Sequence, residues 1–431
     1  MITFLTLYLG IAVGLHTVEV QADPAAAFVE FQLDGRTLPS VTQPPWKTVV
    51  DLGRPVPHEL VAIARDREGA ELGRAVQLVN VPRPNSEASF TLLPGTGGTG
   101  RVACLTFASA FSARPESIEL TFDGKVLDPG NLARIRLPDF RPADVHVLRA
   151  VLEFKGGSRV STEFLVGGVK REAPGGPETM RGEAEAELTA VPVVFKGRPP
   201  KESEMDGWFL ANGEPVHVEA VEESPGEIVV VKDENAGPWI AQLRTSIFFA
   251  QDTRYASPLR KGQRLRFCWP GTLKPTDTAP GYDVFLRSQD FSPPWDVRRL
   301  LIGVAPPEYS GPPRLGDAVG VASLSAAAGN RPRAVVLIVA GGDDESQTPI
   351  AWTRAYLRAL RVPLFVWAKN KRMVDPAWGK PEVLMTSADV PGAVKNVTKA
   401  VEAQRIVWLE GRHLPQSISL SPKARKVTLV E

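Results

Sequence analysis

Two kinds of hydrophobic pattern divide the chain. Up to about residue 225, apolar and polar positions alternate in short runs separated by Gly, Pro, Asn or Asp, as in strands that bury one face. From residue 226 onward, continuous β-branched runs alternate with segments of helical spacing. Such runs are typical of strands buried on both faces. The pattern therefore predicts all-β modules followed by an α/β domain with a mainly parallel sheet.

The N-terminal half contains an internal repeat. Val29–Gly35 matches Ile118–Gly124, and His58–Ala64 matches His146–Leu152. Both copies of the first segment end in Asp-Gly, a pair that tolerates the positive φ angles of a tight hairpin turn. The shared position of the two histidines, just before a strand, suggests a shared structural role at the strand entrance.

The repeat predicts two related β-sandwich modules, at residues 16–83 and 88–168, in which Leu33 corresponds to Phe122 and Leu60 to Leu148. The Asp-Gly strand, the Pro44-Pro45-Trp46 stretch and the HELVAIARDREG run from His58 resemble immunoglobulin-like repeats of bacterial surface proteins. That resemblance implies modules that act as spacers.

The first fifteen residues are apolar but too few for a stable membrane span, which needs about 20 residues. Their length suits a signal peptide, with small residues around Gly14 and Ala22 as cleavage points, or a short N-terminal strand or anchor. Cleavage after Ala22 would remove a strand equivalent to Arg101–Ala108 of the second module. We therefore expect cleavage nearer Gly14 or retention, and an extracytoplasmic protein.

Residues 169–187 have the Gly, Pro and charged composition of a linker, and 188–225 form a β-rich connector. In the α/β domain, 226–431, strands are predicted at Ile228–Val231, Arg264–Trp269, Ala334–Val339, Val362–Trp367, Ile406–Leu409 and Lys426–Val430. Helices are predicted at Trp239–Gln251, Asp317–Ala328, Trp352–Leu360 and Asp389–Ala403. This alternation predicts a doubly wound sheet.

Three segments of this domain, Arg314–Ser346, Leu357–Ala368 and Ala400–Leu414, resemble a von Willebrand factor type A domain of a bacterial, chiefly acidobacterial, group. The stretch Gly207–Glu223 resembles the region just upstream of that domain in the same group. The resemblance covers about 205 residues and implies a Rossmann-like fold with a divalent-cation site at the carboxyl edge of the sheet.

The family's metal ligands are largely missing here. Its first loop supplies Asp-x-Ser-x-Ser, whereas this chain has Asp233, then Asn235 at the first Ser position and Gly237 at the second. The family's Thr falls on Pro313 and its third-loop Asp on Gly341. Mg²⁺ usually needs several converging oxygens. The resemblance therefore implies a degenerate site in which only Asp233, with Asn235 as a weaker second, is left, and we expect no cofactor and no tightly bound metal.

Other side chains at the same sheet edge are candidates for contact. The acidic run Asp343, Asp344 and Glu345 is expected as a solvated loop, and it could also hold a cation in another way or serve a hydrolase together with Asp233. Trp295 and Trp378 lie in loops beside Pro and charged residues, and Trp is frequent at binding hot spots.

Composition narrows the function classes. Fifty basic and forty-nine acidic residues leave a net charge of +1, and no long basic stretch supports nucleic-acid binding. The two cysteines, Cys104 and Cys268, sit in apolar runs and are expected as buried thiols. The GxGxxG match at 95–100 has no preceding strand or following helix, so it predicts a loop.

No catalytic residue is predicted, because none of the five histidines has a local nucleophile or carboxylate pattern. The leading hypothesis is a non-enzymatic envelope or secreted scaffold protein that binds a protein partner. A hydrolase using Asp233, Asp343 and Asp344, and an adhesion domain with altered metal ligands, are the two alternatives.

Overall fold

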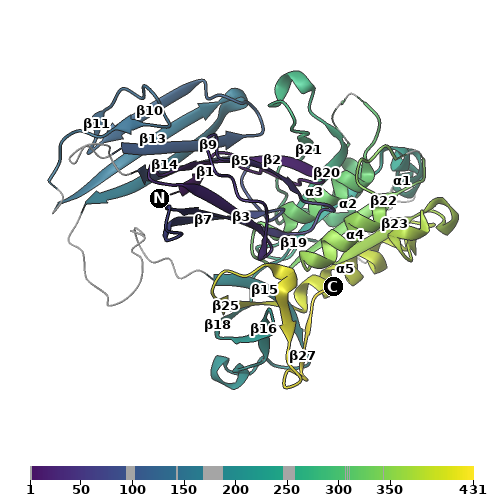
Figure 1. Ribbon diagram of the computed structural model, residues 1–431. Helices are drawn as coiled ribbons and strands as arrows, with labels where there is room; N and C mark the ends of the chain where they lie inside the picture. The colour runs from purple at the N-terminus through teal and green to yellow at the C-terminus, as the bar shows by residue number, and fades with distance from the viewer. Residues whose placement is uncertain are drawn as a thin grey trace. The chain divides into compact units, whose positions relative to one another are not determined.

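A computed structural model describes residues 2–93, 102–141, 144–167, 188–245, 258–305, 307, 309, 311–342 and 344–431 (Figure 1). The chain forms two compact units. Unit 1 comprises Met1–Arg54, His58–Glu185 and Pro275–Asp283, and unit 2 comprises Pro55–Pro57, Ala186–Lys274 and Val284–Glu431. The GxGxxG segment and the predicted linker lie outside the described residues. Among the described residues, no helix is both long and apolar enough to cross a bilayer.

The first module of unit 1 is a sandwich of two antiparallel sheets with strand orders β1-β2-β5 and β4-β3-β6-β7. The strands are β1 (Ile2–Phe4), β2 (Leu15–Ala22), β3 (Phe28–Leu33), β4 (Arg36–Thr37), β5 (Lys47–Asp51), β6 (His58–Arg65) and β7 (Glu71–Val79). Alternate residues of both sheets are buried between them, among them Val18, Phe31 and Leu60. This inward and outward alternation is what the period-two pattern predicted.

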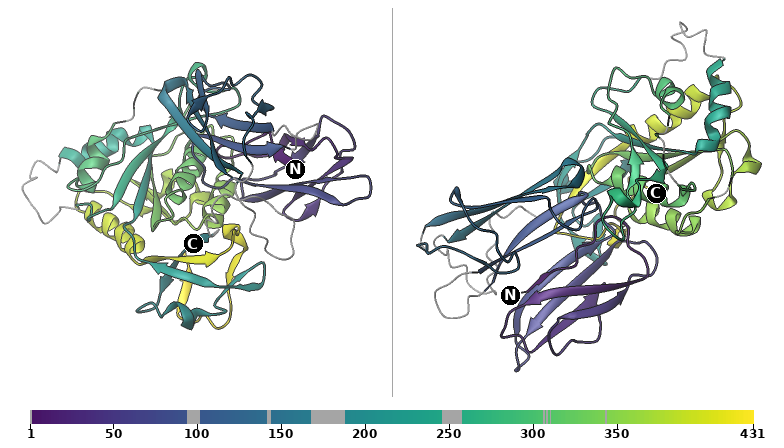
Figure 2. Two further views of the ribbon diagram at one scale, coloured as in Figure 1. Left: turned by 90° about the vertical axis from the view of Figure 1, so that its left-hand side faces the viewer. Right: turned by 90° about the horizontal axis from the view of Figure 1, so that it is seen from above.

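The second module, whose strands are drawn in blue in Figure 2, repeats this plan. Its strand orders are β12-β9-β8 and β11-β10-β13-β14. Its strands are β8 (Ser86–Leu93), β9 (Val102–Ser109), β10 (Ser117–Phe122), β11 (Lys125–Val126), β12 (Ile135–Arg136), β13 (Val145–Phe154) and β14 (Ser158–Gly167). Leu120, Leu148 and Phe154 are central in its core.

Strand register confirms the predicted repeat. Leu33 lies opposite Leu60 in the first module, and Phe122 lies opposite Leu148 in the second. Both Asp-Gly turns have positive φ at both residues, 52° and 78° in the first and 50° and 76° in the second. The shared turn conformation and register show that the two modules have one architecture.

The first module begins earlier than predicted. Ile2 pairs with Ala22, and Ile2 and Phe4 are each 5% exposed in the module core. By strand order, β1 takes the place that β8 has in the second module. The alternative of a short N-terminal strand is therefore confirmed, but the module boundary at residue 16 is wrong, since this segment supplies an edge strand of the sandwich. Apolar content alone does not distinguish such a strand from the apolar region of a signal.

Unit 2 contains a six-stranded sheet of order β21-β20-β19-β22-β23-β24, parallel except for β21 at one edge. The strands are β19 (Glu227–Lys232), β20 (Arg264–Thr272), β21 (Phe285–Arg287), β22 (Arg333–Val339), β23 (Leu364–Ala368) and β24 (Glu382–Val383). Counted along the chain from β19, the order is 3-2-1-4-5-6, that of a doubly wound α/β fold.

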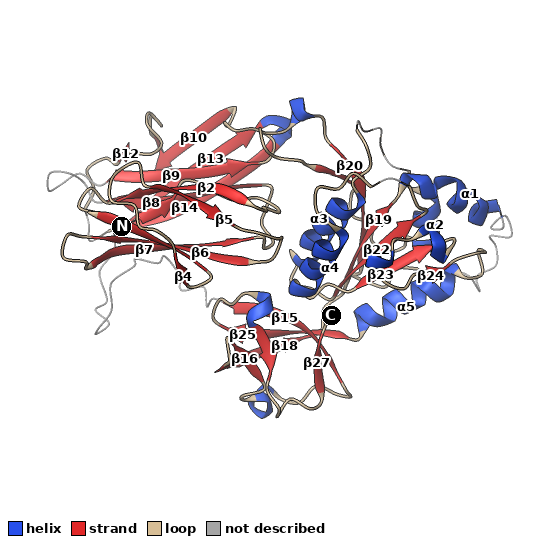
Figure 3. Ribbon diagram, turned by 45° about the vertical axis from the view of Figure 1, so that its right-hand side comes forward, coloured by secondary structure: helices blue, strands red, loops and turns tan. Residues whose placement is uncertain are grey.

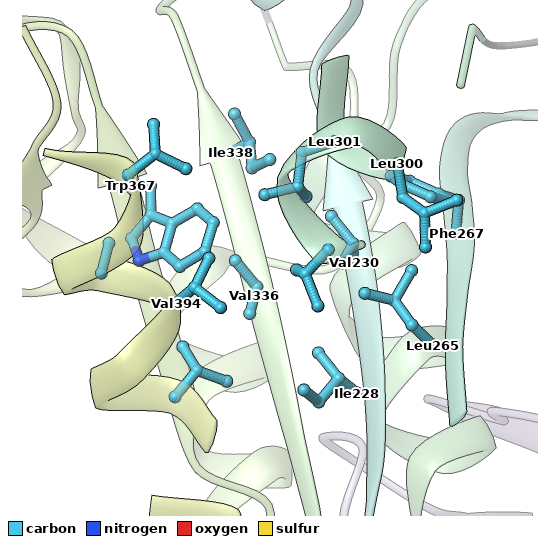
Figure 4. Close-up of a cluster of buried hydrophobic side chains, with 14 of the residues drawn as sticks. Ile228, Val230, Leu265, Phe267, Leu300, Leu301, Val336, Ile338, Trp367 and Val394 are labelled. Carbon is cyan, nitrogen blue, oxygen red and sulfur yellow. The ribbon is translucent and has the colours of Figure 1, made fainter. Parts of the chain in front are cut away.

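Helices cover both faces of this sheet (Figure 3). They are α1 (Gly237–Thr245), α2 (Val297–Gly303), α3 (Leu315–Ala327), α4 (Ile350–Ala359) and α5 (Val390–Glu402). Side chains of α1, α2 and α5 share one core with Ile228, Val230 and Trp367, and Figure 4 labels Leu300 and Leu301 of α2 and Val394 of α5 in this core. On the opposite face, α3 packs against the sheet with α4 beside it (Figure 3). The predicted α/β alternation is therefore present; the predicted helix beyond Thr245 falls outside the described residues.

The last predicted strands of the α/β domain belong elsewhere. β25 (Gln404–Glu410) pairs antiparallel with β15 (Leu188–Phe195) and β18 (Val218–Glu222), and β15 also pairs with β27 (Val427–Leu429). A second sheet contains β16 (Phe209–Ala211), β17 (Glu214–Val216) and β26 (Ile418–Leu420). The connector and the C-terminal residues thus form one β subdomain with its own core, and the boundary that assigned 404–431 to the α/β domain is wrong.

Candidate functional site

The carboxyl ends of β19, β22 and β23 meet at one edge of the parallel sheet, where doubly wound folds place their ligand crevice. A hollow of about 650 Å³ opens there. Its lining includes Asn235, Trp239, Gly341, Glu345, Lys369 and Met373. The loop after each of these three strands therefore contributes to the hollow, and the sequence had pointed to the same edge.

Asp233, which follows β19, is fully buried. Its Oδ1 accepts a hydrogen bond from the amide of Asn235 at 2.9 Å, and its Oδ2 accepts one from the amide of Ala340 at 3.1 Å. Its own amide donates to Ile338 at 2.9 Å. The carboxylate thus ties the end of β19 to the end of β22, and both of its oxygens already serve backbone donors.

Lys232 precedes Asp233 and is also buried, which the sequence analysis did not anticipate. Its Nζ donates to the carbonyl oxygens of Leu301, at 3.2 Å, and Val304, at 3.1 Å, at the end of α2. A cation stabilises the partial negative charge of a helix C-terminus. Burial lowers the pKa of Lys232. In the sequence, the position of Lys232 directly after the β-branched run Ile228–Val231 could have indicated a buried lysine.

Asp344 caps α3. Its Oδ1 accepts from the amide of Leu315 at 2.8 Å and its Oδ2 from that of Gly316 at 3.2 Å, while Ser346 Oγ accepts from the amide of Asp317 at 3.1 Å. The first amides of a helix have no partner within the helix, so this loop satisfies them. Helix α3 in turn accepts hydrogen bonds from the same loop.

The Asp317 carboxylate returns the contact from α3. It accepts from the amides of Gln347 at 2.9 Å and Thr348 at 3.0 Å, and it pairs with Arg314 at 2.8 Å. The acidic loop is thus locked onto the helix, and the expectation of a solvated loop is wrong for Asp344. Glu345 is exposed and lines the hollow, as predicted for a surface residue. Asp343 lies outside the described residues.

The open walls of the hollow carry few charges. Lys369 Nζ donates to Gln242 Oε1 at 3.1 Å, linking the loop after β23 to α1. Asn235 is exposed and lies close to Gly342. A Cβ added at Gly342 would come within 2.6 Å of Asn235 Nδ2, so a larger residue there would displace this side chain. Met373 is 45% exposed and adds an adaptable apolar contact. Lys369, Gln242 and Met373 were missed because no motif marks them.

The two predicted contact tryptophans differ. Trp295 is 51% exposed and packs edge-on against Phe291 at 5.6 Å, so it is available at the surface of unit 2. Trp378 is only 3% exposed, so the prediction that it is a surface contact is wrong: its loop folds back, and its carbonyl accepts from Arg354. Trp352, 41% exposed on α4, is a further surface tryptophan.

A divalent cation in the family manner does not fit these residues. Each carboxylate oxygen of Asp233 already accepts a backbone hydrogen bond, and Pro313 and Gly341 at the other two ligand positions have no side-chain oxygen. Within the described part of the chain, no three His, Cys, Asp or Glu side chains gather to hold a metal. The arrangement can support recognition through amides, one lysine, one glutamate and a methionine.

No protein-family model matches the chain, and no curated protein matches it significantly. Solved structures similar to it include fibronectin(III)-like modules of Clostridium thermocellum CbhA, at 17% identity over 18% of this chain and 93% of that one, with a TM-score of 0.17. The central fibronectin-III array of RIM-binding protein aligns at 9% identity over 48% and 82% of the chains, with a TM-score of 0.22.

Proximal thread matrix protein 1 from the mussel byssus aligns at 13% identity over 48% of this chain and 50% of that one, with a TM-score of 0.25. TM-scores this far below 0.5 carry no argument about fold or function. The architecture of this multidomain protein therefore rests on its own strand pairing, which gives β-sandwich modules and one parallel α/β sheet.

Proposed function

We propose that this chain is a non-enzymatic binding or scaffold protein whose α/β domain contacts a protein partner without a divalent cation. The observation that supports this most is the use of Asp233: both carboxylate oxygens accept backbone hydrogen bonds inside the fold. A hollow of about 650 Å³ remains beside it, large enough for side chains of a partner. The sandwiches of unit 1 would serve as spacers.

We further propose that the α/β domain is a type A-like domain with a degenerate metal site. The 3-2-1-4-5-6 order and the antiparallel edge strand β21 support this, together with the sequence resemblance described above. Placement in the bacterial envelope or outside the cell is part of the same proposal and rests on the resemblance of the repeats to surface proteins.

The hydrolase alternative needs a carboxylate that is free to act as acid, base or nucleophile. Asp233 and Asp344 are both engaged with backbone amides, and Asp344 additionally accepts from Ser346 Oγ. Glu345 is exposed without a second described carboxylate beside it in the hollow. These contacts favour recognition over hydrolysis.

The test is capture from envelope extract on the immobilised full chain, in EDTA and in Mg²⁺. A double variant, Lys369→Glu with Met373→Asp, changes two walls of the hollow, and Lys395→Glu, exposed on α5, is the matched surface control. We expect a protein retained by the wild type and the control in EDTA and lost by the double variant. Retention that requires Mg²⁺, or that survives in the double variant, would contradict the proposal.

A further inference from the structure

The same histidine–aspartate pair occurs in both modules of unit 1. His58 Nδ1 lies 2.7 Å from Asp34 Oδ2, and His146 Nδ1 lies 2.7 Å from Asp123 Oδ2. Each aspartate is the first residue of its Asp-Gly turn, and each histidine stands at the entrance of the strand that pairs with it. The repetition of all these features indicates a device that belongs to the module itself.

The second nitrogen of each ring also faces an acceptor. His58 Nε2 lies 3.0 Å from the carbonyl oxygen of Leu52, and His146 Nε2 lies 3.1 Å from that of Arg141. A neutral imidazole carries one N–H, whereas the imidazolium carries two. A carbonyl oxygen can only accept, and an ionised carboxylate can only accept. Both contacts are therefore hydrogen bonds only when the ring is doubly protonated.

The aspartates hold further backbone. Asp34 Oδ1 accepts from the amide of Glu59 at 2.9 Å, and Asp123 Oδ1 accepts from that of Val147 at 2.9 Å. Each pair therefore joins the hairpin turn, the start of the next strand and the segment before it. The imidazole ring and the carboxylate thus connect three segments of backbone in each module.

We propose that His58 and His146 are imidazolium cations in the folded modules and act as proton-dependent clamps that fasten each Asp-Gly turn to the entrance of the neighbouring strand. Loss of the proton leaves one ring nitrogen facing an acceptor without a hydrogen to donate. The turn and the segment before the strand are then released from each other, and the module loosens at this end.

The surrounding charges favour the protonated ring. Burial alone would lower the pKa of His58, but Asp34, through its hydrogen bond and negative charge, and the backbone of Leu52 and Arg54 together raise that pKa above its ordinary value. For His146, the hydrogen bond with Asp123 raises the pKa most, and Asp144 adds to it. Lys125, Asp139 and Arg141 are the other charged residues of the hollow that His146 lines.

The direction of the pH dependence follows from these shifts. A histidine whose pKa is higher in the folded state contributes stability that is complete below the unfolded pKa, about 6.5, and is lost as pH rises through the folded value. The pKa of each partner aspartate is lowered in turn, so the carboxylate stays ionised across that range. The clamp is closed at mildly acidic pH and opens as the pH rises through the folded pKa of the histidine, which lies above its ordinary value.

The two clamps differ in access to solvent. The His58 side chain is 10% exposed and its contact with Leu52 is buried, whereas the His146 side chain is 16% exposed and its contact with Arg141 faces solvent. His146 also stacks on Phe122 at 5.5 Å and borders a hollow of about 600 Å³. The N–H groups of His58 should therefore exchange with water more slowly than those of His146.

The first experiment is imidazole nitrogen NMR on the ¹⁵N-labelled full chain. At pH 6.5 to 7, both rings should give the pattern of two protonated nitrogens, assigned by loss of the signal in His58→Gln and His146→Gln. His413→Gln is the control, since the Nε2 of this ring lies 2.8 Å from the carbonyl oxygen of Glu410. A neutral single-tautomer pattern for either ring at that pH would overturn the proposal for that module.

The second experiment measures amide exchange of β3, β6, β10 and β13 by mass spectrometry from pH 6 to 9, corrected for the intrinsic rate. Protection in the wild type should fall as pH rises, and each Gln variant should remove the pH dependence from its own module only. Asp34→Asn and Asp123→Asn should do the same. Protection that falls equally in the variants, or does not fall in the wild type, would refute the clamp.

Discussion

Asp233 Oδ2 lies 3.1 Å from the amide nitrogen of Ala340, joining the ends of the two central strands of the α/β sheet. Removing the acceptor in Asp233→Ala leaves the amides of Asn235 and Ala340 without partners. Only the Ala340 amide is buried, since Asn235 is exposed, and an unsatisfied buried donor costs about 1–3 kcal/mol. The α/β domain should therefore lose about 1–3 kcal/mol. Asp233→Asn keeps one oxygen and should lose about half as much. Urea unfolding followed by exchange of β19 and β22 peptides measures both.

An unchanged stability in Asp233→Ala would show that the carboxylate is not a structural tie. The Asn variant is the matched control, since it preserves side-chain volume and one acceptor while removing the charge.

Divalent cations should not stabilise the α/β domain. A ligand that binds only the folded state at a hundredfold excess over its Kd adds about 2.7 kcal/mol. Because both oxygens of Asp233 hold backbone amides and Pro313 and Gly341 offer no side-chain oxygen, too few ligands converge for a tightly bound cation. Melting curves in EDTA and in millimolar Mg²⁺ or Mn²⁺ should therefore coincide. An upward shift with metal that disappears in Asp233→Ala would reverse this interpretation of the site.

Asp344→Ala should destabilise α3, because the amides of Leu315 and Gly316 lose their acceptor. Replacement of an N-terminal capping residue by Ala costs about 0.5–2 kcal/mol. Glu345→Ala, one residue away and exposed, should change stability by about 0.5 kcal/mol or less. Amide exchange in the first turn of α3 should be faster in Asp344→Ala than in the wild type and unchanged in Glu345→Ala. Equal effects would contradict the capping role.

Phe4→Ala should destabilise the first module, although the residue lies in a segment of signal-like composition. Phe4 is 5% exposed, packs in the core of the sandwich and pairs with Val20. Truncation of a buried Phe costs about 3–5 kcal/mol. Leu15→Ala, at a 73% exposed position of β2, should cost about 0.5 kcal/mol or less. Unfolding of both variants is followed by the fluorescence of Trp46, which is buried in the same module. If Phe4→Ala left the stability of the module unchanged, β1 would lie outside the core.

Local patterns identified the longer strands and helices of the α/β domain, but not α2 or the short edge strands β21 and β24. The alternation around Val29–Leu33 and its Asp-Gly pair specify a strand and a turn within a few residues, because side-chain direction in a strand has period two. The matching histidines then aligned the two modules correctly. Continuous β-branched runs such as Ile228–Val231 likewise mark strands covered on both faces.

Partners distant in the chain were decided only by the tertiary structure. The run Ile406–Leu409 is as apolar as a strand of a parallel sheet, yet Val407 pairs antiparallel with Val191, since hydrophobicity specifies burial and not the neighbouring strand. Asp344 resembles a solvated acid until the start of α3, some thirty residues earlier, is brought to it. Burial of Trp378, and the packing of Ile2 and Phe4 against the first sandwich, also depend on chain segments that no local pattern identifies.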